Sequence, residues 1–147
     1  HLQLIAEISG DLIRFEDVGC FVLKHAEEYL FPDTKLFLKE LALHGYNTFL
    51  VTAGTAWFQE AKIAGSGILQ FLTAYKVVKD PTKCFVIPSL CTKKDKVVLF
   101  DDSKNVIDAI KKEFPHILAI QVLRDTNPVV GNLKEAMGTL LAHQKPL

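Results

Sequence analysis

The fold of this chain is decided by residues 96–122, which read KVVLFDDSKNVIDAIKKEFPHILAIQV. The apolar run 97–100 predicts a buried strand that ends at two adjacent aspartates. Ser103 is a good N-cap for a helix through Phe114, on which apolar residues recur at helical spacing. A second apolar run, 117–122, predicts another strand. A strand, a helix and a strand in this order predict two parallel strands with the helix packed on one face.

The same alternation continues on both sides of this unit. Pro32, Asp33 and Thr34 indicate the start of a helix that ends near Gly45. Residues 68–90 show no clear period. The other expected elements are strands at 2–8 and 47–52 and helices at 18–30, 55–64 and 132–143. We therefore expect a single α/β domain over residues 1–147, with a three-layer, Rossmann-like parallel sheet covered by helices on both faces.

Composition supports a folded domain and excludes several function classes. The chain has 147 residues, of which 49% are hydrophobic and 23% are charged, so a sizeable core is expected. Lys and Arg number 17 and Asp and Glu number 17, which argues against a broad nucleic-acid-binding face. No apolar run approaches the ~18–20 residues of a membrane span, and the start lacks the pattern of a signal peptide.

The cysteines and the first residue bear on where the protein acts and on what the sequence contains. Cys20, Cys84 and Cys91 form no CxxC pair, so we expect reduced thiols in a cytoplasmic protein. The chain begins with His1 rather than Met, so we expect a processed form or a piece of a longer protein.

Polar side chains follow several of the predicted strands. Ligands of open parallel sheets bind beyond the carboxyl ends of the strands, so these side chains are expected to share one crevice. They are Glu7, Ser9 and Asp11 after the first strand, Thr52 after the second, Lys76 and Lys79 further on, and Asp101 and Asp102 after the run 97–100.

The pair Asp101–Asp102 is the most informative of these. Two adjacent carboxylates at the end of a buried strand repel each other, and a hard cation such as Mg²⁺ would compensate them. Alternatively, one aspartate caps the next helix and the other is solvated. Thr52 or a lysine alone is weak evidence, but together with the acids they supply what is needed to hold a phosphate group with magnesium.

On these residues the chain resembles the haloacid dehalogenase (HAD) superfamily, most of whose members are magnesium-dependent phosphohydrolases. Residues 96–122 are similar to its fourth motif, and residues 31–54, FPDTKLFLKELALHGYNTFLVTAG, to the region of its second motif, whose Ser/Thr falls on Thr52. The third motif is a lysine at loose spacing, for which Lys79 is the first candidate and Lys76 the alternative.

The first motif departs from the family pattern. The family has a strand followed by Asp-x-Asp-Gly-Thr/Val, and here residues 4–15 read LIAEISGDLIRF. Glu7 falls on the nucleophilic aspartate, Ser9 on the acid/base aspartate, and Gly10 on the glycine. The resemblance implies metal ligation by the Glu7 carboxylate, the Ser9 carbonyl and the acids Asp101 and Asp102.

Both departures weaken catalysis. The extra methylene of Glu7 displaces its carboxylate, and such a shift can cost ~10²-fold in rate. Ser9 cannot protonate a leaving group at neutral pH, and the loss of a general acid costs ~10²–10⁴-fold. The resemblance therefore implies an impaired domain that binds a phosphorylated small molecule, a phosphorylated macromolecule or a protein partner.

Two alternatives stay open. In the first, the chain is a working magnesium-dependent phosphohydrolase of phosphate monoesters that uses Glu7. In the second, this phosphohydrolase uses an upstream aspartate. In the second case the match at residues 7–11 is accidental.

Residues 12–31 allow only a short flap and a helix instead of a cap domain. We therefore expect an open site that is covered by a macromolecular substrate or by a partner subunit of an oligomer. A response-regulator receiver is disfavoured because its acidic pair follows the first strand.

Overall fold

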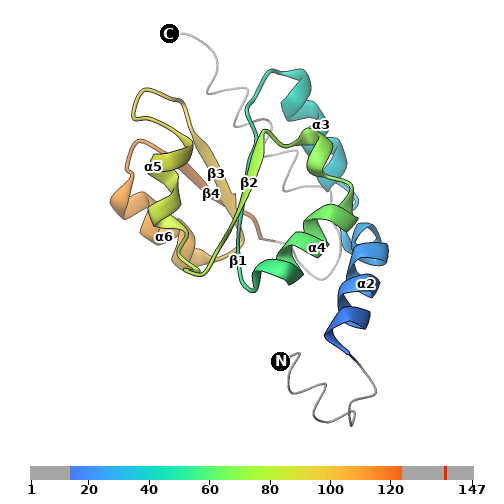
Figure 1. Ribbon diagram of the computed structural model, residues 1–147. Helices are drawn as coiled ribbons and strands as arrows, with labels where there is room; N and C mark the ends of the chain where they lie inside the picture. Colours follow the sequence, from blue (N-terminus) through green and yellow to red (C-terminus); the bar gives the residue numbers. More distant parts are fainter. Residues whose placement is uncertain (1–13, 124–137, 139–147) are drawn as a thin grey trace.

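The computed structural model describes residues 14–123 and residue 138 and has a mixed α/β fold (Figure 1). The strand expected at 2–8 and the helix expected at 132–143 lie outside these residues, as do Glu7, Ser9 and Asp11. The described elements are α2 (Phe15–His25), η1 (Ala26–Tyr29), α3 (Thr34–Leu43), β1 (Phe49–Ala53), α4 (Ala56–Ser66), η2 (Leu69–Phe71), β2 (Ala74–Val78), η3 (Cys84–Val86), α5 (Ile87–Leu90), β3 (Val98–Asp101), α6 (Lys104–Glu113) and β4 (Leu118–Gln121).

The strands form two parallel pairs. β1 pairs with β2 from Phe49↔Ala74 to Ala53↔Val78, and the connection between them contains α4. β3 pairs with β4, with Asp101 opposite Gln121, and α6 makes the connection. Within the described residues each pair is a two-stranded sheet. The prediction of a mixed α/β fold with parallel strands is therefore confirmed.

The two pairs carry different helices. Figure 1 shows β3, β4, α5 and α6 on one side of the β1–β2 pair, and α2, α3 and α4 on the other. The ring of Phe37 on α3 nevertheless meets the ring of Phe100 on β3 edge to face, with centroids 5.4 Å apart. α3 thus contacts the second pair of strands as well as leading into the first.

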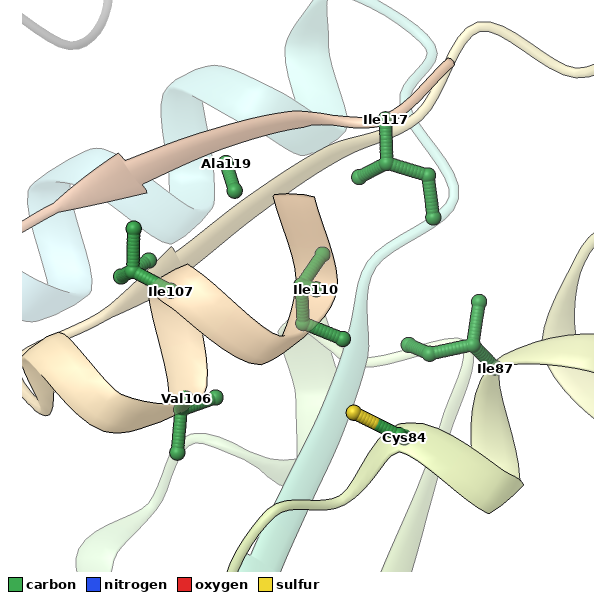
Figure 2. Packing of buried hydrophobic residues seen from close by; sticks show 7 residues of the cluster. All are labelled: Cys84, Ile87, Val106, Ile107, Ile110, Ile117 and Ala119. Atoms are coloured by element: carbon green, nitrogen blue, oxygen red, sulfur yellow. The ribbon is translucent and has the colours of Figure 1, made fainter. Parts of the chain in front are cut away.

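A compact hydrophobic cluster lies around α6 (Figure 2). Ile110 is completely buried, and its side chain faces Cys84 and Ile87 from the segment that follows β2. The cluster consists of Cys84, Ile87, Val106, Ile107, Ile110, Ile117 and Ala119. Because it joins residues from η3 to β4, it fixes the segment after β2 relative to the β3–β4 pair.

The helix boundaries follow ordinary end signals. α3 starts directly after Asp33 and is followed by Gly45 with φ +75°. α4 starts after Thr55 in extended conformation and ends at Gly67 in the left-handed region, with φ +69°. Glycine is favoured there because it has no Cβ to clash with the backbone.

Candidate functional site

The carboxyl ends of β2 and β3 are joined by an ion pair. Lys83 lies in the turn that follows β2, and its Nζ is 2.6 Å from Oδ2 of Asp101, the last residue of β3. The two side chains are only 20% and 8% exposed, so water screens this pair less than an exposed one. Oδ1 of Asp101 accepts a hydrogen bond of 2.9 Å from the backbone N–H of Ser103. The Asp101 carboxylate is thereby fixed at both oxygens.

The backbone of Lys83 is unusual. Within the described residues it is the one residue other than glycine with positive φ, at +61°. This conformation costs roughly 1–2 kcal/mol for a residue with a Cβ, and it persists where the surroundings over-determine it. The turn before it is held by Asp80, whose carboxylate accepts hydrogen bonds from the backbone N–H of Thr82 at 2.8 Å and from its hydroxyl at 2.9 Å. Lys83 is thus held where its ammonium reaches Asp101.

The end of β1 lies at the same edge. The N–H of Gly54 donates to the carbonyl of Val78, at the end of β2, at 3.0 Å. Thr52 donates its hydroxyl to Oε1 of Gln59 at 3.2 Å, and Nε2 of Gln59 donates to the carbonyl of Ala53 at 3.3 Å. The chain leaving β2 leads directly to Lys83. The Thr52 hydroxyl thus lies near the carboxyl edge of the β1–β2 pair, and the ion pair between Lys83 and Asp101 connects the end of β2 to the end of β3.

Gly54 is required by this arrangement. Its φ of +142° belongs to a region that favours glycine, and a Cβ there would lie 2.8 Å from Nε2 of Gln59. The glycine therefore lets the chain turn away from β1 while Gln59 holds the Thr52 hydroxyl.

The lysines named from the sequence lie elsewhere. Lys79 is exposed, and Lys76 donates a hydrogen bond of 2.8 Å to the hydroxyl of Ser89. The lysine that meets Asp101 is Lys83, which is not among the site residues predicted from the sequence. The signal that could have found it is the turn-forming sequence Asp-Pro-Thr at 80–82, directly before Lys83.

The second aspartate of the pair has a different environment. Asp102 is exposed, and its backbone carbonyl accepts a hydrogen bond of 3.0 Å from Nε2 of Gln121 on β4. The other two predicted metal ligands, Glu7 and Ser9, lie outside the described residues. Within the part of the chain that is described, no group of three or more His, Cys, Asp or Glu side chains is arranged to hold a metal ion.

The donor set at Asp101 fits a hard cation in part. Each carboxylate oxygen has lone pairs beyond the one that accepts from Lys83 or from Ser103, so Asp101 retains capacity for a metal. Carboxylate and carbonyl oxygens are the ligands that Mg²⁺ prefers. Asp101, with exposed Asp102 beside it, would therefore hold one side of such an ion.

An open cavity of about 560 Å³ lies beside Thr52. α2, η1, α4 and β1 supply most of its walls, which are largely apolar. Leu50, Phe58 and Ile63 line it together with the polar side chains of Thr52 and Gln59. The hydrogen-bonded pair at the end of β1 is therefore part of the wall of this cavity.

Comparisons with protein-family models, with curated proteins and with solved structures give no match for this chain. Among the helices of the described residues, none has the length and apolar character needed to cross a membrane.

Proposed function

We propose that this chain is a HAD-like domain that binds the phosphate group of a phosphorylated ligand and is impaired in hydrolysing it. The observation that carries the proposal is the shielded ion pair between Lys83 and Asp101 at an edge that also holds the end of β1. An ammonium, a hydroxyl and a carboxylate at one edge of parallel strands are the groups that phosphate binding with a divalent cation requires.

Each group has a distinct part in this proposal. The ammonium of Lys83 has further N–H donors beyond the one on Asp101, and these would bond phosphate oxygens. Its partner Asp101 keeps the lysine in place. The Thr52 hydroxyl, now on Gln59, would donate to another phosphate oxygen. Mg²⁺, when bound through Asp101 and Asp102, would neutralise charge on the phosphate.

The loss of hydrolysis follows from the first motif. Glu7 retains a carboxylate but carries it on a longer side chain than the aspartate of the family pattern, so its attack on phosphorus would be misaligned. Ser9 replaces the residue that would protonate the leaving group. Binding needs neither nucleophilic attack nor proton transfer, so it survives both changes.

We also infer the sheet that this fold would have. Within the described residues β1 is paired only with β2, and β3 only with β4. β1 and β3 therefore each have one edge at which a further strand could pair. A further strand between them would join the two pairs into one parallel sheet, in which β1 and β3 are inner strands and β2 and β4 are edge strands. Helices on both faces would then make the three-layer architecture that the sequence predicts.

The proposal is tested by measuring binding and turnover on the same protein. Calorimetric titration with inorganic phosphate in the presence of Mg²⁺ should show binding that Asp101→Ala weakens at least tenfold. Hydrolysis of p-nitrophenyl phosphate should stay at the rate of the buffer. Turnover that both Glu7→Ala and Asp101→Ala abolish would instead establish a working phosphohydrolase, and absence of phosphate binding would refute the proposal.

A further inference from the structure

We propose that the phosphorylated ligand carries a bulky apolar body, of the size of one or two aromatic rings, and that this body lies in the cavity beside Thr52. The inference rests on the proposed function, because it places the phosphate at the strand ends. It goes beyond that function by naming the class of ligand as aryl or similarly apolar phosphate monoesters.

The first support is that Thr52, a residue of the proposed phosphate site, also lines the cavity. Thr52 belongs to the phosphate-binding edge, and both Thr52 and its hydrogen-bond partner Gln59 line the cavity. A ligand whose phosphate meets the Thr52 hydroxyl would therefore lie at the wall of this cavity. A cavity of about 560 Å³ lies within the range of sites that hold small organic molecules.

The second support is the character of the walls. Leu50, Ile63 and Ile68 are half-buried or buried and form apolar parts of the lining. Aromatic side chains with large exposed fractions line it as well, namely Phe21 (53%), Tyr29 (75%) and Phe31 (47%). Exposed aromatic side chains around an apolar cavity suit a planar apolar group, because covering them removes apolar surface from water.

The third support is charge. Among the described residues that line the cavity none is acidic, and the one charged side chain is that of Lys62, whose Nζ lies 5.7 Å from the centroid of the Phe58 ring. A phosphate monoester is an anion at neutral pH. The lining therefore attracts the charge of such a ligand while it accommodates the apolar body.

The single tryptophan provides a direct readout. The ring of Trp57 packs edge to face on Phe58, a cavity residue, with centroids 5.6 Å apart. We therefore compare methylphosphonate with naphthylmethylphosphonate, which hydrolysis cannot consume, by calorimetry and by Trp57 fluorescence. The naphthyl compound should bind at least tenfold more tightly and should change the fluorescence, whereas methylphosphonate should leave it unchanged.

Two variants and one control complete the test. Phe58→Ala should remove most of the preference for the naphthyl compound while the affinity for methylphosphonate changes less than twofold. Tyr29→Ala should remove part of this preference. Because Tyr29 is exposed, this substitution should not destabilise the fold. Leu43→Ala alters a similarly exposed apolar residue that does not line the cavity, and it should change neither affinity.

The outcomes separate this inference from the proposed function. Equal affinity for the two phosphonates, or a preference that Phe58→Ala and Tyr29→Ala leave intact, overturns the inference and leaves phosphate binding standing. Absence of binding by both compounds overturns the proposed function together with the inference.

Discussion

At the scale of single residues, Lys83 combines a backbone conformation that lysine rarely adopts with an ion pair shielded from water. We predict that Lys83→Met destabilises the protein by about 3 kcal/mol, because it leaves the Asp101 carboxylate buried without its cation. The measurement is urea unfolding followed by circular dichroism. Lys79→Met removes an exposed lysine from the same turn and should change the free energy of unfolding by less than about 0.5 kcal/mol. Equal effects of the two changes would contradict the structural role of Lys83.

The cysteines allow a second prediction at this scale. Burial, and then the nearby negative charge of Glu113, raise the pKa of the Cys84 thiol, and burial also raises the pKa of Cys91. Cys20 is exposed. Because the thiolate is the reactive form, a thiol reagent at about pH 8 should modify Cys20 in the folded protein and the other two only after unfolding.

The same shifts set a dependence of stability on pH. A thiol whose pKa is raised by folding stabilises the folded protein fully below its ordinary pKa, and this contribution is lost as the pH rises through the raised pKa. Stability should therefore decline on the alkaline side, above about pH 9, and Cys84→Ser should make that decline shallower. Rapid modification of all three thiols in the folded protein would contradict the burial of Cys84.

At the scale of elements, the contact between α2 and α4 depends on one glycine. A Cβ on Gly65 of α4 would run into the backbone of Leu23 on α2, which cannot move aside as a side chain could. Gly65→Ala should therefore destabilise the protein by about 3 kcal/mol or separate the two helices.

Gly19 on α2 is the matched control for Gly65. A Cβ there would meet the Trp57 ring at 3.6 Å, which is ordinary van der Waals contact. Gly19→Ala should stabilise the protein by about 0.5–1 kcal/mol, because alanine is the better helix former. Thermal and urea unfolding of both variants give the sign of the change in the free energy of unfolding. The same sign for both variants would contradict the packing of α2 on α4.

Elements with a strong apolar signal could be predicted from the sequence, and weaker ones could not. The run 97–100 corresponds to β3 (Val98–Asp101), and the run 47–52 overlaps β1 (Phe49–Ala53). β2 (Ala74–Val78) escaped because its first three residues are exposed and Lys76 interrupts its apolar pattern. Its position is fixed by pairing with β1, which is a contact between distant segments and leaves no local period.

The candidate site shows the same limit. Asp101 and Thr52 could be named because each ends an apolar run. Motif spacing does not identify Lys83, because its contact with Asp101 depends on a positive φ and on the Asp80–Thr82 hydrogen bonds, and the turn-forming sequence at 80–82 is the local signal for that turn. Sequence spacing favoured Lys79, which lies in the same turn but is exposed.

At the scale of the whole molecule, the inferred single sheet makes a prediction about β1 and β3. If a further strand lies between them, the amides of β1 and β3 are protected on both sides and should exchange with deuterium more slowly than those of the edge strands β2 and β4. Exchange measured by mass spectrometry on the intact chain tests this, with the exposed turn at 92–95 as the fast reference. Exchange of β1 and β3 as fast as that of β2 and β4 would contradict the inferred sheet.

In the proposed function, the strand ends form one phosphate-binding edge in which Lys83, and not Lys79, supplies the cation. Phosphorus NMR of inorganic phosphate titrated in the presence of Mg²⁺ compares the wild-type protein with Lys83→Met and Lys79→Met, each shown to be folded by circular dichroism. We predict that Lys83→Met weakens phosphate binding at least tenfold and that Lys79→Met leaves it within a factor of two. Binding that Lys83→Met leaves unchanged, or that Lys79→Met abolishes, would contradict this role of Lys83.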